Sequence, residues 1–303
     1  MITPPELRKG DTIAIVAPAR SVAEADMEPA IQILNQWGLQ VVTGKHLFNR
    51  HHQFSGTDEQ RASDFQEMMD DARIKAILCA RGGYGTVRTL ERLNFNKFIN
   101  QPKWIIGFSD ITVLHSYINH SLGIKTLHAQ MADNFPKNGK ENQALKHLKD
   151  ALFGRKLTFS WETEEEASHK TEITGQLTGG NLSVLYSLSA TPFDISTDEK
   201  ILFLEDVDEY LYHVDRMMMN FKLAGKLERI KGLVIGGMTE MNDNKVPFGK
   251  TAFEIIRDVA EPYDFPLFFD CPSGHIDNNF PLIMGGTTKI RKTKKTIDVE
   301  FIP

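Results

Sequence analysis

A serine stands where an apolar stretch gives way to a helical pattern. The run Trp104–Phe108 has the composition of a buried strand, and Ser109 follows it directly before the helical stretch Asp110–Ser121. A serine at such a turn has its hydroxyl lifted out of the sheet, at a helix N-terminus whose N–H groups favour developing negative charge. The segment predicts a nucleophile at Ser109. Because no glycine follows two places later, capping of the helix by Ser109 or Asp110 is the structural alternative.

A serine nucleophile needs a base, since its hydroxyl is inert at neutral pH. Among ten histidines, His275 lies in a loop just after the strand-like run Pro266–Asp270, where open α/β sheets place reactive groups. Glu205 follows the apolar run Lys200–Leu204 and could hold an imidazole in one tautomer. Ser, Glu, His is one of the known triad orders. A surface histidine and a helix-capping glutamate are the alternatives.

A glycine-rich loop follows the predicted strand Ile74–Cys79. Three of the four positions 82–85 are glycine, so the backbone can turn several N–H groups toward an anion. Such a loop suits an oxyanion hole or a phosphate cradle. The sequence has neither the Gly-Lys-Ser/Thr of a P-loop nor the spacing of a dinucleotide fingerprint. A plain tight turn is the alternative.

The predicted pattern of strands and helices that positions these residues differs between the two halves of the chain. The first half alternates apolar strands with amphipathic helices, which predicts a parallel sheet covered on both faces, in a domain at 1–155. A polar connection or exposed edge is expected at 156–174, with an acidic cluster from Glu162 to Glu166. A second α/β domain is expected at 175–303. Its elements are a loop at Gly175–Gly180, helices at Asn181–Ser189 and Val207–Leu223, strands at Lys200–Leu204, Leu233–Met238, Pro266–Asp270 and Ile297–Ile302, and a basic hairpin at Lys289–Lys295.

Composition narrows the function classes. The 303 residues carry 35 Lys and Arg against 40 Asp and Glu, and this net charge of −5 argues against a general nucleic-acid binder. No apolar stretch approaches the roughly 20 residues of a membrane span, and Met1–Gly10 lacks the apolar region of a signal peptide. Cys79 and Cys271 form neither a disulfide framework nor a metal-type pair. We expect a soluble, cytoplasmic protein that binds neither nucleic acid nor a membrane.

Seven segments, in order and spread over nearly the whole chain, resemble the LD-carboxypeptidase family of serine peptidases. That group contains the muramoyltetrapeptide carboxypeptidases and the microcin C self-immunity peptidase. The matching segments are IAIVAPAR near the start, ARGGYGTVR at 80–88, IIGFSDIT at 105–112, LTGGNLSVL at 177–185, ILFLEDVDE at 201–209 followed by YLYHVDRM, LVIGGM at 233–238 and PSGH at 272–275.

The resemblance implies a fold and a mechanism. It implies an N-terminal parallel-sheet α/β domain related to class I amidotransferases, and a C-terminal mixed α/β domain with barrel-like strands. By position, Ser109 is the nucleophile, His275 the base and Glu205 its orienting carboxylate, while the backbone N–H groups of Gly83 and Asp110 form the oxyanion hole. The family needs no metal or cofactor and is typically homodimeric. It cuts the amide between an L-centre, usually of a diamino acid, and a terminal D-alanine in murein tetrapeptide, for cytoplasmic peptidoglycan recycling.

A carboxypeptidase must also recognise a terminal carboxylate. Arg81 is a candidate because a guanidinium pairs with a carboxylate through two hydrogen bonds, although a structural ion pair would explain it equally well. Tyr84 and Asn181 are weaker candidates for lining the site.

Three other functions remain open. A microcin-immunity-type amidase acting on peptidyl or aminoacyl nucleotides would need an aromatic surface. The tryptophans do not supply one, since Trp37 and Trp104 are expected in the core and Trp161 in the polar connection. Cys79 could be the nucleophile of an amidotransferase-like enzyme, but its place inside an apolar strand favours an inert thiol. A muropeptide-binding sensor with a degenerate site is disfavoured by the presence of the serine, glutamate and histidine.

Overall fold

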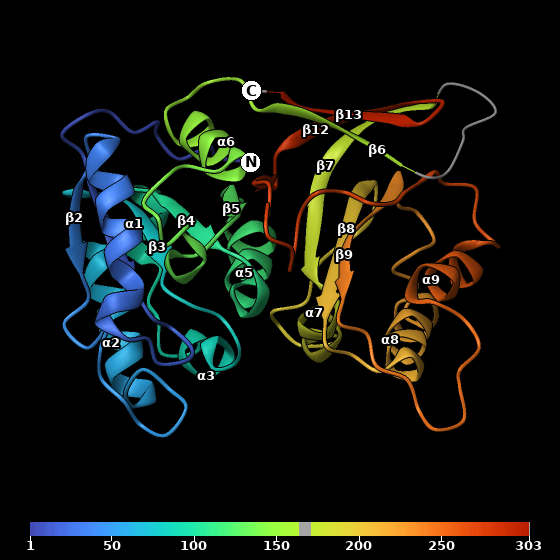
Figure 1. Cartoon of the computed structure of the whole chain (residues 1–303), viewed down its shortest axis with the longest axis horizontal. Coiled ribbons are helices and arrows are strands. Elements are labelled where there is room, and N and C mark those ends of the chain that lie inside the picture. Colours follow the sequence, from blue (N-terminus) through green and yellow to red (C-terminus); the bar gives the residue numbers. More distant parts are fainter. Residues whose placement is uncertain (164–170, 303) are drawn as a thin grey trace. The chain divides into compact units, whose positions relative to one another are not determined.

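The chain forms two compact units (Figure 1). The computed structural model describes residues 1–163 and 171–302. The first unit contains residues 1–155 and 280–283, and the second contains the described residues of 156–279 and 284–302. The chain therefore enters the second unit after residue 155, returns to the first for four residues, and ends in the second.

The first unit is built on a sheet with the strand order β11-β5-β4-β3-β1-β2. The pairs from β2 through β1, β3 and β4 to β5 are all parallel, as the alternating pattern predicts. The central strands are almost wholly buried, which is why they form continuous apolar runs. The strands are β1 (Thr12–Val16), β2 (Gln40–Thr43), β3 (Ile74–Cys79), β4 (Trp104–Gly107), β5 (Thr126–His128) and β11 (Leu282–Met284).

Helices follow the strands of this sheet, and their ends have local causes. Thr57 and Gln60 form a capping box at the start of α2, and Gly123, with a φ of +67°, ends α5 in the left-handed conformation. Trp37 and Trp104 are buried, which confirms their assignment to the core. The helices are α1 (Glu24–Gln36), α2 (Asp58–Asp70), α3 (Thr86–Leu90), α4 (Asn96–Asn100), α5 (Thr112–Leu122) and α6 (Gln143–Leu152), with short 3₁₀ turns η1 (Ser109–Ile111) and η2 (Ala132–Asn134).

The second unit has a mixed sheet with the order β10-β9-β8-β7-β12-β13-β6. Strands β7 to β10 pair in parallel, whereas β7, β12, β13 and β6 pair antiparallel. The basic run Lys289–Lys295 lies in the β12–β13 hairpin, as predicted. The strands are β6 (Thr158–Glu162), β7 (Thr171–Asn181), β8 (Lys200–Val207), β9 (Gly232–Thr239), β10 (Leu267–Phe268), β12 (Thr287–Thr293) and β13 (Thr296–Ile302).

The helices α7 (Leu182–Leu188), α8 (Leu211–Leu223) and α9 (Ala252–Ala260) pack on β8 and β9 (Figure 1). Their shared core includes Leu185, Phe221, Ile256, Leu204 and Ile235. Within the residues that the structure describes, no helix has the length and apolar character to cross a membrane.

Two expectations for this unit are wrong, and one is partly outside the described residues. Gly175–Gly180 is not a loop but part of β7. A Cβ on Gly179 would overlap the carbonyl oxygen of Phe203, so this glycine permits close approach of two strands. The helix expected at Val207–Leu223 begins only at Leu211, because β8 continues through Val207. The connection expected at 156–174 includes the edge strand β6, which contains Glu162, and its last residues belong to β7, while Glu164–Glu166 lie outside the described residues.

Candidate functional site

Ser109 occupies a strained turn between β4 and a helix. Phe108 is extended, with a φ of −145°, and Ser109 then takes a φ of +61° before η1 and α5 begin. A non-glycine residue in this region costs on the order of 1–3 kcal/mol and needs support from its surroundings. Phe108 and Ile111 are buried on either side, and a Cβ on Gly107 would lie 2.8 Å from Ile111 Cγ1. The predicted strand-to-helix turn is therefore present and is tightly packed.

A buried histidine is hydrogen-bonded to the backbone just before this turn. The Nε2 of His115 lies 2.9 Å from the carbonyl oxygen of Gly107, which also accepts a hydrogen bond from Ala129 N–H at 3.1 Å. Burial lowers the pKa of His115 to about 4, so the ring is neutral at pH 7. Since a carbonyl can only accept, Nε2 must carry the hydrogen. The sequence places His115 on a helix but offers no signal for this role.

The glycine loop runs directly beside Ser109. A Cβ on Gly82 would lie 3.1 Å from Ser109 Cβ and 3.3 Å from its Oγ, and Gly83 has a φ of +99°. Asp110 fastens the loop to the turn, because its Oδ2 accepts a hydrogen bond of 2.8 Å from Thr86 N–H. Burial raises the pKa of Asp110, and the bonds from Thr86 oppose that rise. The glycine loop therefore lies against the side chain of Ser109 and is tied to its turn by a hydrogen bond.

Two other residues of this loop were expected to contact a substrate. Arg81 is 45% exposed, and its Nε lies 3.5 Å from Asp133 Oδ2. Burial raises the pKa of Asp133 to about 6, and the charge of Arg81 acts in the opposite direction. Tyr84 is exposed and packs near Phe54, with 6.1 Å between ring centroids. Arg81 thus has a carboxylate partner within the protein.

In the second unit, Glu205 and His275 form a close pair. Glu205 Oε2 lies 2.6 Å from His275 Nδ1 and 3.2 Å from the backbone nitrogen of the same residue. Glu205 is fully buried, whereas the His275 side chain is 19% exposed. Gly274 has a φ of +111°, and a Cβ there would lie 2.8 Å from Glu205 Oε2, so a side chain at this position would disturb the pair. The carboxylate accepts from Nδ1–H, which leaves Nε2 as the basic nitrogen.

The charges around His275 favour its protonated form. Burial alone would lower the pKa of His275, but the hydrogen bond and charge of Glu205, together with the charges of Asp206 and Glu240, raise it overall. A base of this kind is active above its raised pKa. The pair therefore has the geometry and the electrostatics of a histidine base with an orienting carboxylate.

Asn181 and Asp206 form a second polar arrangement beside this pair. Asn181 Nδ2 donates to Asp206 Oδ1 at 2.9 Å, and Asn181 Oδ1 caps α7 by accepting from Val184 N–H at 3.1 Å. Ser183 N–H donates to the other Asp206 oxygen at 2.9 Å. Burial and the charge of Glu205 raise the pKa of Asp206 to about 7. Sequence reasoning assigned no role to Asp206, although it directly follows Glu205.

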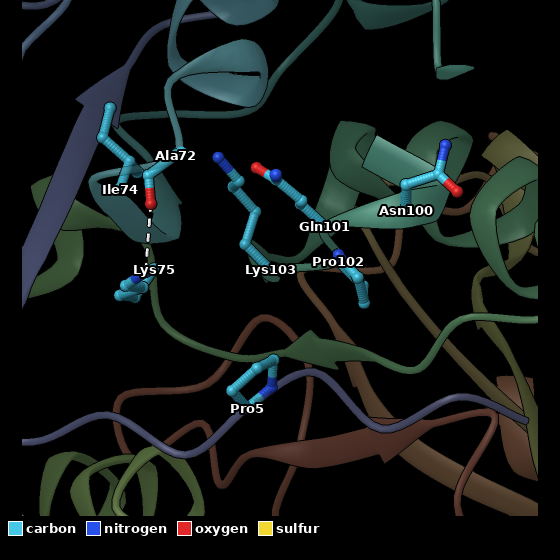
Figure 2. Close-up of a pocket in the computed structure, with 8 residues that line it drawn as sticks. All are labelled: Pro5, Ala72, Ile74, Lys75, Asn100, Gln101, Pro102 and Lys103. Atoms are coloured by element: carbon cyan, nitrogen blue, oxygen red, sulfur yellow. Dashed lines mark hydrogen bonds between the residues drawn. The ribbon is translucent and has the colours of Figure 1, made fainter. Parts of the chain in front are cut away.

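The thiol of Cys79, at the end of β3, and the pocket in Figure 2 are two further candidates for chemistry in the first unit. Cys79 is fully buried, and burial raises the pKa of its thiol, which argues against a cysteine nucleophile. A pocket of about 340 Å³ (Figure 2) lies where β3 and β4 begin, whereas Ser109 follows the end of β4. Its Lys103 donates to the carbonyls of Met68 and Asp71 at the C-terminal end of α2, at 3.2 and 2.7 Å. That lysine is therefore part of a helix cap.

Comparisons with known proteins agree with the resemblance found in the sequence. A family model for the LD-carboxypeptidase N-terminal domain matches residues 13–129, and one for the LD-carboxypeptidase C-terminal domain matches residues 174–290. The probable murein peptide carboxypeptidase of Bacillus subtilis (strain 168) is 34% identical over 306 residues, covering 98% of this chain and 94% of that protein. The murein tetrapeptide carboxypeptidase of Pseudomonas aeruginosa is 29% identical, covering 87% of each protein.

A solved structure shows the same fold. The muramoyltetrapeptide carboxypeptidase of Oxalobacter formigenes matches with a TM-score of 0.85 and 27% identity, covering 96% of this chain and 99% of that chain. The two family models account for most of the chain, and a relative above 30% identity spans nearly all of it. On these grounds the chain belongs to the LD-carboxypeptidase family of peptidases.

Proposed function

We propose that this protein is a serine-type LD-carboxypeptidase that releases the terminal D-alanine from murein tetrapeptide. The observation that carries the proposal is the strained conformation of Ser109, whose φ of +61° is held beside a glycine loop. Strain of this kind persists where surrounding structure over-determines it, and it is concentrated at functional sites. The names of the relatives from Bacillus subtilis and Pseudomonas aeruginosa support the murein peptide as substrate class.

In the proposed mechanism, His275 Nε2 takes the proton of Ser109 Oγ as that oxygen attacks the scissile carbonyl carbon. Backbone N–H groups of Gly83 and Asp110 hold the resulting oxyanion. The tetrahedral intermediate collapses, its C–N bond breaks, and the protonated His275 gives its proton to the departing amine of D-alanine. Water, deprotonated by His275, then attacks the acyl-enzyme and releases the shortened peptide. Glu205 holds the imidazole in one tautomer and stabilises its charged form throughout.

The other expected contacts complete the proposal. Arg81 and Tyr84, exposed on the glycine loop, are candidates for contacts with the peptide, and Asn181 would act on the site through Asp206. The resemblance also motivates the proposals that the enzyme works as a homodimer and serves peptidoglycan recycling in the cytoplasm.

Mass spectrometry of murein tri-, tetra- and pentapeptides after incubation with the purified protein tests the reaction. We expect loss of D-alanine from the tetrapeptide, and no such loss with the Ser109→Ala variant at an unchanged circular dichroism spectrum. Unchanged release by Ser109→Ala would refute the assignment. An aminoacyl nucleotide assayed in parallel distinguishes the immunity-type amidase, which would cleave that substrate and spare the tetrapeptide.

A further inference from the structure

Arg20 lies across the glycine loop beside Ser109. It follows the end of β1, and the carboxyl ends of the parallel strands β1, β3 and β4 share one edge of the sheet. A Cβ on Gly83 would lie 2.5 Å from Arg20 Cδ and 2.6 Å from its Nε, while the neighbouring Gly82 faces Ser109 in the same way. The absence of a side chain at Gly83 therefore makes room for the arginine stem.

The backbone of Arg20 is held in place. Its N–H donates to the carbonyl oxygen of Gly82 at 3.4 Å, and Ser21 N–H donates to Gln53 at 2.9 Å. Arg20 also forms an isolated antiparallel bridge with Phe54. The base of the side chain is thus fixed beside the glycine loop.

The guanidinium of Arg20 has no carboxylate partner within 4 Å among the described residues, and the residue is exposed. The other arginines around this loop are paired: Arg81 with Asp133 at 3.5 Å, Arg88 with Asp58 at 2.8 Å, and Arg61 with Asp58. Its charge nevertheless reaches the turn, because burial raises the pKa of Asp110 while the charges of Arg61 and Arg20 oppose that rise. Arg20 therefore brings to this loop a positive charge that has no acidic partner among the residues that the structure describes.

We propose that Arg20 binds the terminal carboxylate of the peptide substrate. The proposal rests on the proposed function. In a C-terminal residue the carboxylate carbon is three bonds from the scissile carbonyl carbon, hence roughly 3–4 Å away. If Gly83 N–H holds the oxyanion, the carboxylate must lie beside that same residue, where the Arg20 stem crosses the loop. A planar guanidinium can bind a carboxylate through two parallel hydrogen bonds.

The test compares murein tetrapeptide with the same peptide amidated at its C-terminus. We expect the preference of the enzyme for the free acid, measured as the ratio of the two kcat/KM values, to fall about 10- to 150-fold in Arg20→Gln, the range for a hydrogen bond to a charged group. Arg20→Lys, which keeps the charge but not the paired geometry, should lose less. Arg50→Gln, a change at another exposed arginine, should leave the ratio at its original value.

Two results would overturn the assignment. One is an unchanged ratio in Arg20→Gln. The other is a fall of the acid-to-amide ratio in Arg81→Gln but not in Arg20→Gln, which would make Arg81 the residue that binds the carboxylate. Calorimetric titration of the Ser109→Ala variant with the two peptides separates this proposal from the reaction. If Ser109→Ala binds the free acid more tightly than the amidated peptide, and adding Arg20→Gln removes this difference, the site is supported even without turnover. Equal binding of the two peptides while Arg20 is intact refutes the site. Failure of the original protein to release D-alanine counts against the proposed function alone.

Discussion

Replacing Glu205 with glutamine removes one charge from the centre of the Glu205–His275 pair while keeping its shape. The carboxylate is fully buried and accepts from His275 Nδ1 at 2.6 Å and from His275 N–H at 3.2 Å. A glutamine that presents its carbonyl oxygen to the imidazole must bury its amide N–H groups where Glu205 Oε1 has no hydrogen-bond partner. A glutamine that presents its amide would hold the wrong tautomer. Either arrangement impairs the base.

The expected loss follows from the role of the charge. Exchange of a triad carboxylate for an amide lowers kcat by about 10⁴-fold, which corresponds to roughly 5 kcal/mol of transition-state stabilisation. The pH profile should move as well. Because Glu205 supplies the main interactions that raise the pKa of His275 against burial, its neutralisation lowers that pKa. Activity requires the neutral imidazole, so the rising limb of kcat/KM should shift to lower pH in Glu205→Gln.

A matched control is available in the first unit. Asp64 contacts His46 in the same way, through Nδ1 at 2.7 Å and the backbone N–H at 2.7 Å, and its side chain is 4% exposed. Release of D-alanine from tetrapeptide would be followed from about pH 5 to 9, with melting temperatures checking the fold. In Asp64→Asn, the rising limb of the kcat/KM profile should stay at its original pH. The reasoning would be refuted by a Glu205→Gln variant whose kcat is within tenfold of the original and whose kcat/KM rises with pH over the same range.

Other predictions concern the supports of the two units. Asp110→Ala leaves the buried N–H of Thr86 without its acceptor, so we expect about 1–3 kcal/mol of lost stability and a lower melting temperature, and Asp110→Asn, which restores an oxygen, should recover part of it. Recovery no better than alanine would argue against this bond. Burial lowers the pKa of Lys103 from its ordinary value of 10.5 to about 8. Between these values the unfolded chain binds more protons, so this group makes stability rise with pH by about 3 kcal/mol. In urea unfolding, the free energy of unfolding should rise less from pH 8 to 10.5 in Lys103→Met than in the original protein. An equal rise would contradict the lowered pKa of Lys103.

The sequence was most informative where structure is local. The Ser109 turn could be predicted because an apolar strand, a glycine and a helix stand side by side in the chain, and the structure has that turn. The parallel sheet of the first unit followed from the same alternation. The pairing of Glu205 with His275 joins positions 70 residues apart. Their places after predicted strands only suggested it beside helix capping and a surface histidine, and the family resemblance favoured it.

The errors have equally specific causes. The glycines near Gly179 were interpreted as a turn, but glycine also serves where two strands approach closely, and composition does not separate these uses. His115 and Asp206 received no role because their importance comes from burial and from partners in other elements. Arg20 was not considered from the sequence, since only the folded chain shows that it crosses the glycine loop and that Arg81 has an acidic neighbour.

The return of residues 280–283 to the first unit has a consequence for biosynthesis. Strand β11 belongs to the same sheet as β1, so that sheet is incomplete until the ribosome has made more than nine-tenths of the protein. Until then β5 is an edge strand with one unpaired side, which can pair with another nascent chain. A fragment ending at residue 155 would keep that unpaired side permanently, and we expect it to aggregate where the full chain does not.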